Sequence, residues 1–536
     1  MKMRIGKILA CAVLAFSMSF SMVGCGSSTA GVVVGITEEV DSMNPLVAEN
    51  MVSFEVFSLI YDPLIKFDEN YDAVPCLAES WETNEDGTEW TFHLADATWH
   101  DGEPVVAEDV KLTYELMEAS YLYGTYATDI DEIECPDDKT VIFKCGKPKV
   151  NLLRSTIPVL PAHIWAELGE DGAYEYANDE CIGSGPYVFA GKDDTTINLT
   201  LNENYFAEGG KVPAYSFMLY KSQDGLASAL KAGEVAGATS LGATQLKAMA
   251  KEDGISIIEG SINGWTNVFI NVSDSEGSTG HPLLKDKAVR QAIEYCTDKE
   301  AIIEKAYGGV GIVADTIVPI TDTQYHYTPE KLRKYDVDAA NALLDAAGYV
   351  DSDNDGIREA NGKPIEFRMA AVADNTEEVK AAQIIAGGCE KAGIRIKFET
   401  MDSGKMWDDA WEFDYDLIIS GYGGDLDPST ILGVFSSSFY AEWDGTNDFG
   451  YVSAAYDNLY AKQGTIVDEA ERAEVINQMQ QIVYEDAPAI MLLYDSYVQA
   501  VRTDVVTGFE QIPEGGSYFF NSTIVNYLNA EMAAEE

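Results

Sequence analysis

One stretch of the chain carries oxygen donors at the spacing of a calcium-binding loop. Five residues would supply the ligands: Asp351, Asp353, Asp355, Ile357 through its carbonyl, and Glu359. Gly356 takes the sixth place, where such loops turn sharply. The twelfth place is Gly362 instead of a bidentate glutamate, so the affinity for calcium should be low. The alternative is a plain acidic hairpin loop, and we expect no cofactor to be required.

Catalytic motifs do not emerge from the sequence. The patterns His-Glu-x-x-His, Gly-x-Ser-x-Gly and the phosphate-binding Walker loop are absent. Gly183-Ser184-Gly185 comes nearest to a nucleophile elbow, but the Pro186 that follows favours a tight turn. Pairs of carboxylates carry no information on glycosidase chemistry in a chain with 90 acidic residues. The chain is therefore predicted not to be an enzyme, with a lipid-anchored hydrolase as the alternative of another class.

The N-terminus resembles an export signal that ends in a lipidated cysteine. Basic residues precede an apolar run over residues 8–20, which is too short to span a membrane stably. Residues 22–25, Met-Val-Gly-Cys, resemble the bacterial lipobox. Residues 1–24 are therefore predicted to be a signal peptide, and residues 25–30 a flexible tether that begins with lipidated Cys25. The alternative is an ordinary cleavable signal with an incidental cysteine.

The charge of the chain is far from balanced. It has 35 basic and 90 acidic residues and a formal net charge of −55. The electric field of such a negative net charge repels nucleic acid and anionic lipid headgroups and attracts cations. Nucleic acid is therefore excluded as a partner, and the membrane is reached only through the lipid. Two interpretations remain: a repulsive surface that keeps the protein soluble, or electrostatic help in recruiting a cationic ligand.

The cysteines give a weaker signal. Six remain after residue 25: Cys76, Cys135, Cys145, Cys181, Cys296 and Cys389. Their spacing suggests one pair, because residues 133–145 form a predicted hairpin that could bring Cys135 and Cys145 together. The alternative is that all six stay reduced.

Strand and helix signals are mixed throughout, which favours an α/β class. Residues 81–94 predict a hairpin around the turn Asn84-Glu85-Asp86-Gly87. Residues 107–117 predict a helix, and an apolar stripe at helical spacing predicts another over 289–296. A further helix is expected from Thr297, and one near 339–347.

Several of these segments match the motifs of one known family. The matching runs are Tyr61-Asp62-Pro63-Leu64, Leu77-Ala78-Glu79-Ser80-Trp81, Trp90-Thr91-Phe92-His93-Leu94, Trp99-His100-Asp101-Gly102-Glu103-Pro104, Ile182-Gly183-Ser184-Gly185-Pro186-Tyr187 and Val289-Arg290-Gln291-Ala292-Ile293. Through these motifs the chain is similar to family 5 of the extracytoplasmic solute-binding proteins, which serve peptide and nickel ABC importers. The resemblance extends over almost the whole chain.

The resemblance implies an α/β fold shaped as a two-lobed clamshell. It is the type II periplasmic-binding-protein clamshell, in the large cluster with an extra inserted subdomain. Lobe I would comprise residues 31–265, including the inserted subdomain at about 60–185, together with the returning segment 500–536; lobe II would comprise residues 266–499. We expect the chain to cross between the lobes near residues 263–267 and 493–497, where Gly264 suits a hinge.

The resemblance also points to a ligand site. In peptide-binding relatives, a carboxylate on a lobe II loop after an apolar strand pairs with the ammonium of the peptide. Residues 416–420 are such a strand and residues 421–428 the loop, so Asp425 is the first candidate. The other candidate ligand-binding residues are Tyr422, Trp265 and Asp427. The alternatives are turn formation for the two aspartates and ordinary packing for the two aromatic residues.

The expected function follows from this resemblance. The chain would capture peptides between closing lobes, as a monomer, and deliver them to the permease subunits of an ABC importer at the outer face of a Gram-positive membrane. Residues 369–375 lack the arginine with which dipeptide-specific relatives clamp a carboxylate, so longer peptides fit better. Five histidines, none near the 421–428 loop, argue against nickel. The alternative is a surface receptor for a signal peptide or a non-peptide solute.

Overall fold

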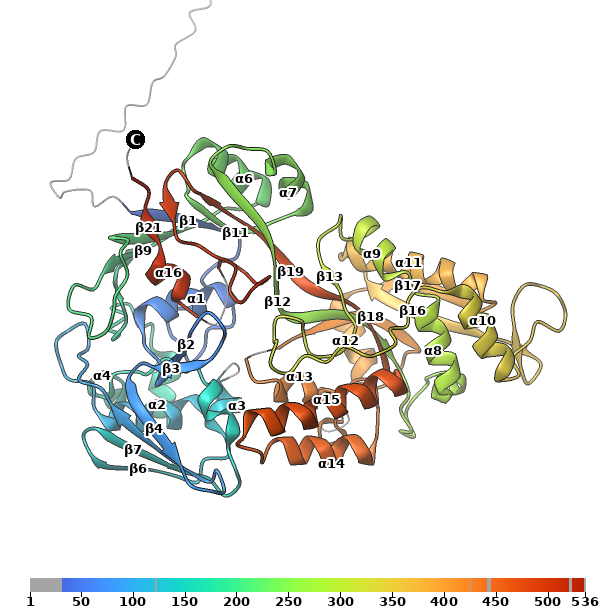
Figure 1. The fold of residues 1–536 in the computed structure, drawn as a ribbon, viewed down its shortest axis with the longest axis horizontal. Coiled ribbons are helices and arrows are strands. Elements are labelled where there is room, and N and C mark those ends of the chain that lie inside the picture. Colours follow the sequence, from blue (N-terminus) through green and yellow to red (C-terminus); the bar gives the residue numbers. More distant parts are fainter. Residues whose placement is uncertain (1–30, 121–122, 425, 441–444, 520–522, 535–536) are drawn as a thin grey trace, which may run out of the picture.

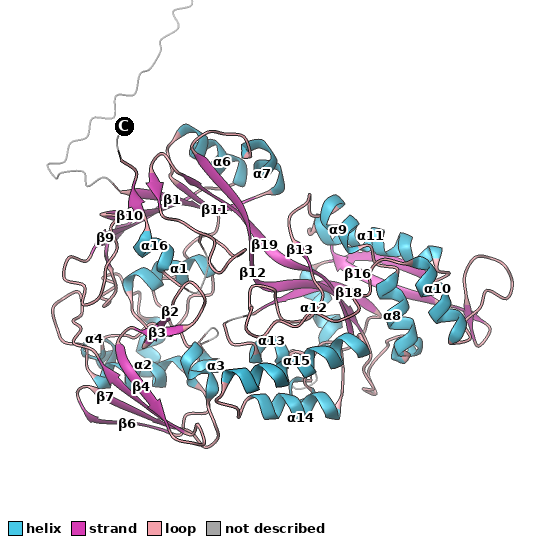
Figure 2. Ribbon diagram, viewed as in Figure 1, coloured by secondary structure: helices cyan, strands magenta, loops and turns pink. Residues whose placement is uncertain are grey.

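The computed structural model describes residues 31–534 except 121–122, 425, 441–444 and 520–522. The predicted signal peptide with Cys25, and the candidate Asp425, therefore lie outside the described residues. Figure 1 shows two lobes joined by a pair of long strands, and Figure 2 shows helices and strands mixed in both. Val32 and Tyr527, from the two ends of the chain, share one hydrophobic core. The predicted α/β fold with two lobes is confirmed.

One sheet of eleven strands, counted over the described residues, runs through both lobes. Its strands in spatial order are β17 (Arg395–Met401), β16 (Glu366–Val372), β18 (Leu417–Gly423), β12 (Ile255–Ile270), β19 (Ala489–Arg502), β11 (Gly237–Leu241), β1 (Val32–Ile36), β10 (Ala214–Leu219), β9 (Thr196–Leu201) and β8 (Tyr187–Lys192), with β13 (Ile312–Val313) beside β19. In each lobe a parallel set is present, β10-β1-β11 in lobe I and β17-β16-β18 in lobe II. The antiparallel pair β12 and β19 connects the two sets.

The connecting pair is irregular at the predicted crossing. The register between β12 and β19 shifts between Ser261 and Trp265. Within this interval the carbonyl of Asn263 accepts a hydrogen bond from the backbone N–H of Gly424, at 2.7 Å. An interrupted ladder is easier to bend than a regular one. This segment is the natural place for a hinge, whereas the residue boundaries given above for the lobes stay a prediction.

The inserted subdomain has its own sheet. Its strand order is β4 (Ala78–Thr83), β5 (Glu89–Leu94), β7 (Thr140–Lys144) and β6 (Glu132–Asp137), and a small hairpin pairs β2 (Ile65–Phe67) with β3 (Ala73–Pro75). The hairpin predicted at 81–94 and the helix predicted at 107–117 are both confirmed, the latter as α2 (Ala107–Met117). Although Val106 has no capping hydroxyl, the Asp109 carboxylate accepts from the Val106 N–H at 2.8 Å and caps this helix.

The Cys135–Cys145 bridge that the spacing suggests does not form, because the hairpin register keeps the two residues apart. Glu134 pairs with Ile142, so Cys135 lies across from the residues next to Val141. Cys145 lies several residues further along the chain from Val141. At about 3.3 Å per residue the separation exceeds the roughly 7 Å that a disulfide can bridge. The six cysteines of the described residues are free thiols.

Helices cover both faces of the lobe II sheet. On one face, Val268 and Ile270 pack against α8 (Lys287–Tyr295), α9 (Lys299–Lys305), α10 (Val337–Ala346) and α11 (Thr376–Lys391). On the other face, Phe269 packs in the core formed with α12 (Ser403–Trp411), α13 (Ser429–Gly433), α14 (Ala454–Gln463) and α15 (Glu469–Asp486). Alternate residues of a strand point to opposite faces, which explains this division. The predicted helices at 289–296, after Thr297 and near 339–347 are confirmed.

Lobe I is completed by shorter helices. These are α1 (Met51–Ile60), α3 (Gly124–Ala127), α4 (Ala162–Trp165), α5 (Gly169–Glu175), α6 (Gln223–Ala232), α7 (Ala243–Met249) and α16 (Val525–Asn529), the last next to the strand pair β20 (Val506–Thr507) and β21 (Glu531–Met532). Among the described residues, no helix combines the length and the apolar character needed to cross a membrane.

Candidate ligand site between the lobes

The loop that follows β18 leaves the sheet beside the hinge and runs between the lobes. Tyr422 is paired in register with Trp265 of β12, and Gly424 is bonded to Asn263 at the irregular segment. Leu426 is 6% exposed and packs into the hydrophobic core of lobe I, although it belongs to a loop of lobe II. The loop that the sequence singles out is therefore an element of the interface between the lobes.

Tyr422 is held firmly but keeps exposed surface. Its ring stacks on Phe269 with centroids 5.7 Å apart and meets Trp265 edge-on at 5.6 Å. Its hydroxyl donates to the Asp448 carboxylate and lies 3.0 Å from the carbonyl oxygen of Thr446. Burial raises the pKa of Asp448 to about 7. A partly exposed aromatic ring with fixed orientation, next to the loop, can contact a ligand.

Trp265 does not line the site. Its side chain has no exposed surface, and its indole N–H donates to the carbonyl of Ile317 at 2.8 Å. A fully covered ring whose one donor is already bonded has nothing left to offer a ligand. The prediction of a cleft residue is therefore corrected: Trp265 is a packing residue of the lobe II core.

Asp427 also has a different role from the one predicted. It is 2% exposed, and its two carboxylate oxygens accept from the two terminal nitrogens of Arg472 at 2.7 and 2.8 Å. Burial on its own would raise the pKa of Asp427, but the adjacent Arg472 guanidinium lowers it to about 2. Both oxygens accept hydrogen bonds from Arg472, and one also accepts from the backbone N–H of Ser429 at 2.8 Å, so Asp427 holds the loop together. Arg472 carries no sequence signal that would have predicted this pair.

The inserted subdomain touches lobe II on the side of α15. Arg154 ends a short 3-10 helix, Val150–Arg154, and its guanidinium lies 3.3 Å from the carboxylate of Glu469. The same guanidinium bonds the side-chain oxygen of Gln324 and lies 5.6 Å from the ring centroid of Tyr325. The two lobes are therefore in contact at this point as well as through the strands β12 and β19.

Two further carboxylates have raised pKa values. Asp495 of β19 accepts a hydrogen bond from the Thr266 hydroxyl at 2.9 Å, and burial raises its pKa to about 6. Glu378, in the first turn of α11, is 9% exposed, and burial raises its pKa to about 7. No sequence motif marks either of these two carboxylates.

A comparison with known proteins identifies the family. Residues 72–443 match the family described as bacterial extracellular solute-binding proteins, family 5 middle. The chain belongs to this family.

Relatives of this family-5 chain cover nearly its whole length. The oligopeptide-binding protein AppA of Bacillus subtilis is 25% identical over 506 residues, 91% of this chain and 90% of AppA. The dipeptide-binding protein of Escherichia coli is 24% identical over 515 residues, 90% and 92% of the two chains.

Solved structures confirm the fold of this family-5 protein. NikZ from Campylobacter jejuni, in complex with Ni(L-His), is 25% identical, has a TM-score of 0.72, and the match covers 94% of this chain and 99% of NikZ. HbpA2 from Haemophilus parasuis is 22% identical with a TM-score of 0.80, covering 94% and 100%. Membership in a family of extracellular binding proteins places the chain outside the cytoplasm and in the class of proteins that bind solutes.

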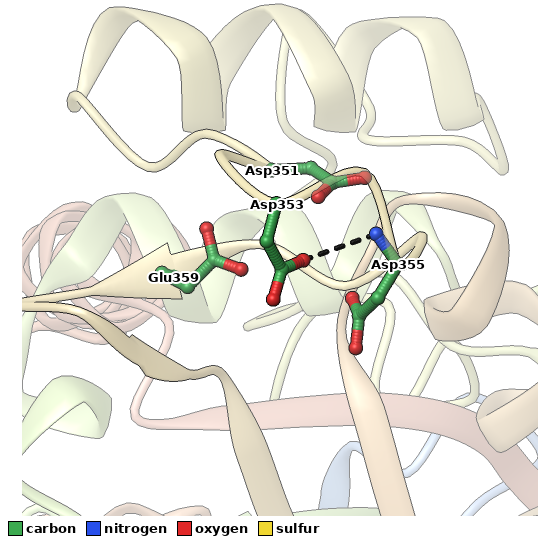
Figure 3. Close-up of side chains that lie close together, drawn as sticks. All are labelled: Asp351, Asp353, Asp355 and Glu359. Atoms are coloured by element: carbon green, nitrogen blue, oxygen red, sulfur yellow. Dashed lines mark hydrogen bonds between the residues drawn. The ribbon is translucent and has the colours of Figure 1, made fainter.

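The acidic loop of this family-5 protein lies after α10, away from the hinge. Figure 3 shows the carboxylates of Asp351, Asp353, Asp355 and Glu359 facing one another, and one oxygen from each lies within 4.8 Å of the others. Asp353 also accepts from the backbone N–H of Asp355 at 3.1 Å. Ile357 is 4% exposed and anchors the loop, which ends in β14 (Glu359–Ala360). This oxygen set fits a hard cation, and calcium binding stays a prediction.

Calcium should stabilise this loop only weakly. Because Gly362 supplies no bidentate ligand, we expect a dissociation constant in the range of roughly 0.1–1 mM. Calcium at tenfold the dissociation constant should then add about 1.4 kcal/mol to the free energy of unfolding. Thermal unfolding with and without calcium measures the effect, which Asp353→Ala should remove. An unchanged melting temperature at 10 mM calcium would leave the plain hairpin loop as the right interpretation.

Proposed function

We propose that this chain captures peptides between its two lobes and delivers them to an ABC importer. The observation that carries the proposal is the packing of Leu426. This residue belongs to the lobe II loop 424–428, yet it is buried in the hydrophobic core of lobe I beside the hinge. A ligand held by that loop would be enclosed when the lobes close. The similar Bacillus subtilis AppA is an oligopeptide-binding protein, which supports peptides as the ligand class.

Within this proposal, Asp425 pairs with the peptide ammonium and Tyr422 contacts the peptide. Tyr422 has the exposure and the fixed ring that a contact residue needs. A specificity for dipeptides alone is not supported, because the stretch 369–375 has no basic residue to clamp a nearby carboxylate. The guanidinium of Arg368, directly before this stretch, lies 3.2 Å from Asp414 and 3.4 Å from Asp416.

Mass spectrometry of ligands retained after gentle purification tests the proposed function. We expect short peptides, present in up to equimolar amounts. Recovery of a metal chelate or a sugar derivative in place of peptides would favour the alternative, a receptor for a non-peptide solute. That alternative has one supporting observation: the similar NikZ binds Ni(L-His).

We further propose that the protein is a monomer tethered by lipid on Cys25 to the outer face of a Gram-positive membrane. The tether would keep the loaded receptor within reach of the permease, which raises their effective concentration. Cys25→Ser removes the thiol that would carry the lipid, so the variant should no longer be lipidated. Metabolic labelling with a radioactive fatty acid measures this, and equal labelling of the variant and the wild type would contradict it.

A further inference from the structure

Asp448 is a buried carboxylate that lies directly behind Tyr422 of the proposed ligand site. Asp448 is 1% exposed, and its Oδ2 atom accepts a hydrogen bond from the Tyr422 hydroxyl. Its other oxygen, Oδ1, is buried and has no hydrogen-bond partner among the residues that the structure describes. A buried polar atom without a partner costs free energy and is rare in folded proteins. The contact with Tyr422 is therefore the one interaction that gives this carboxylate a use.

The backbone around Asp448 is fixed by the core of lobe II. The Tyr415 hydroxyl donates to the carbonyl of Asp448 at 2.5 Å. On one side, the buried amide of Asn447 donates to two backbone carbonyls, at 2.8 and 3.0 Å. On the other side, Phe449 stacks on Phe435 with ring centroids 4.7 Å apart. The carboxylate is therefore held at a set place, from which it can fix the hydroxyl of Tyr422.

The surroundings of this carboxylate carry phenols and no balancing cation. Tyr422 contacts it, while Tyr415 is influenced by both Asp448 and Tyr440. Among the described residues no basic side chain pairs with Asp448, and burial raises the pKa of Asp448 to about 7. The carboxylate is therefore mostly ionised at pH 8 and mostly neutral at pH 6. A hydrogen bond to an ionised acceptor is about twice as strong as one to a neutral acceptor, so Tyr422 is held more firmly at pH 8.

We infer that Asp448 is a positioning residue for ligand capture, which holds the Tyr422 hydroxyl and thereby fixes the ring that contacts the ligand. The inference rests on the proposed function, because it takes Tyr422 as a residue that contacts the peptide. A side chain that is already ordered costs less entropy on binding than one that the ligand must order. The unpartnered oxygen has the opposite effect on folding, since a buried charge without a partner destabilises the folded state. A neutral residue at this position should therefore weaken binding without lowering stability.

Calorimetric titration with tetra-alanine at pH 8 and pH 6 tests the inference. Asp448→Asn keeps the size of the side chain and an acceptor oxygen but cannot ionise. At pH 8 this variant should bind about threefold to tenfold more weakly than the wild type. At pH 6, where the wild-type carboxylate is neutral as well, the two affinities should be nearly equal. Urea unfolding at pH 8 should show that the variant is at least as stable as the wild type, which separates a positioning role from a purely structural one.

Asp408→Asn provides the matched control. It makes the same change at an exposed aspartate of α12 in the same lobe. This variant should bind tetra-alanine as the wild type does at both pH values. Because wild type and variants are compared at the same pH, the titration of other groups cancels from each ratio.

A double-mutant cycle with Tyr422→Phe gives a second readout. Phenylalanine keeps the ring and its stack on Phe269 but removes the hydroxyl. If Asp448 acts through that hydroxyl, Asp448→Asn should not weaken binding further in the Tyr422→Phe background. Additive losses, or wild-type affinity of Asp448→Asn at pH 8, would overturn the inference and leave peptide capture standing. If the wild type does not bind tetra-alanine at all, the proposed function fails together with the inference.

Discussion

Asp427→Ala is expected to lower the free energy of unfolding by about 3–5 kcal/mol, the usual cost of removing one partner from a buried ion pair. The substitution leaves the Arg472 guanidinium, which is 3% exposed, without its carboxylate. Equilibrium unfolding in urea measures the loss. The contribution should be present above pH 4 and disappear as the pH falls towards 2, because the folded-state pKa of Asp427, about 2, lies below the ordinary value of 3.8.

An exposed ion pair provides the control for this prediction. Lys231 and Glu252 lie 2.9 Å apart, with 38% and 46% of their side chains exposed. Removal of an exposed partner typically costs about 1 kcal/mol or less, so Glu252→Ala should be nearly neutral. Replacement of both members of the buried pair, Asp427→Leu with Arg472→Met, should recover much of the lost stability. A loss for Asp427→Ala as small as that for Glu252→Ala would contradict the structural role.

Asp425→Ala should weaken peptide binding by well over tenfold, with little effect on stability. If this carboxylate pairs with the peptide ammonium in a desolvated site, its removal costs about 2–5 kcal/mol of binding free energy. Titration calorimetry measures the change. Asp353→Ala, the same substitution in the acidic loop away from the hinge, serves as the control and should bind peptide normally. An unchanged affinity in Asp425→Ala would remove this residue from the proposed site.

The sequence predicts local elements of this fold well and tertiary partners poorly. The hairpin at 81–94 and helix α2 were predictable because turn residues and apolar spacing lie within one short segment. The clamshell was predictable because long motifs match a known family. The strand register that separates Cys135 from Cys145 was not predictable. It is set by the geometry of the hairpin turn, which the residue types do not show.

Site residues were harder to predict than the fold. Trp265 and Asp427 have side chains that could bind a ligand, and they lie near the hinge. Their polar atoms are hydrogen-bonded to Ile317 and Arg472, which are 52 and 45 residues away in the chain. The sequence shows which side chains can form hydrogen bonds, but only the fold shows which residues are their partners.

Calorimetric titration of ligand-free protein with one peptide, in its free and N-acetylated forms, tests the central claim of peptide capture most directly. The account predicts saturable binding of the free peptide with one site per chain, recovery of the peptide intact, and at least about tenfold weaker binding once acetylation removes the ammonium charge. Absence of binding to any peptide, or cleavage of the peptide during the titration, would contradict it.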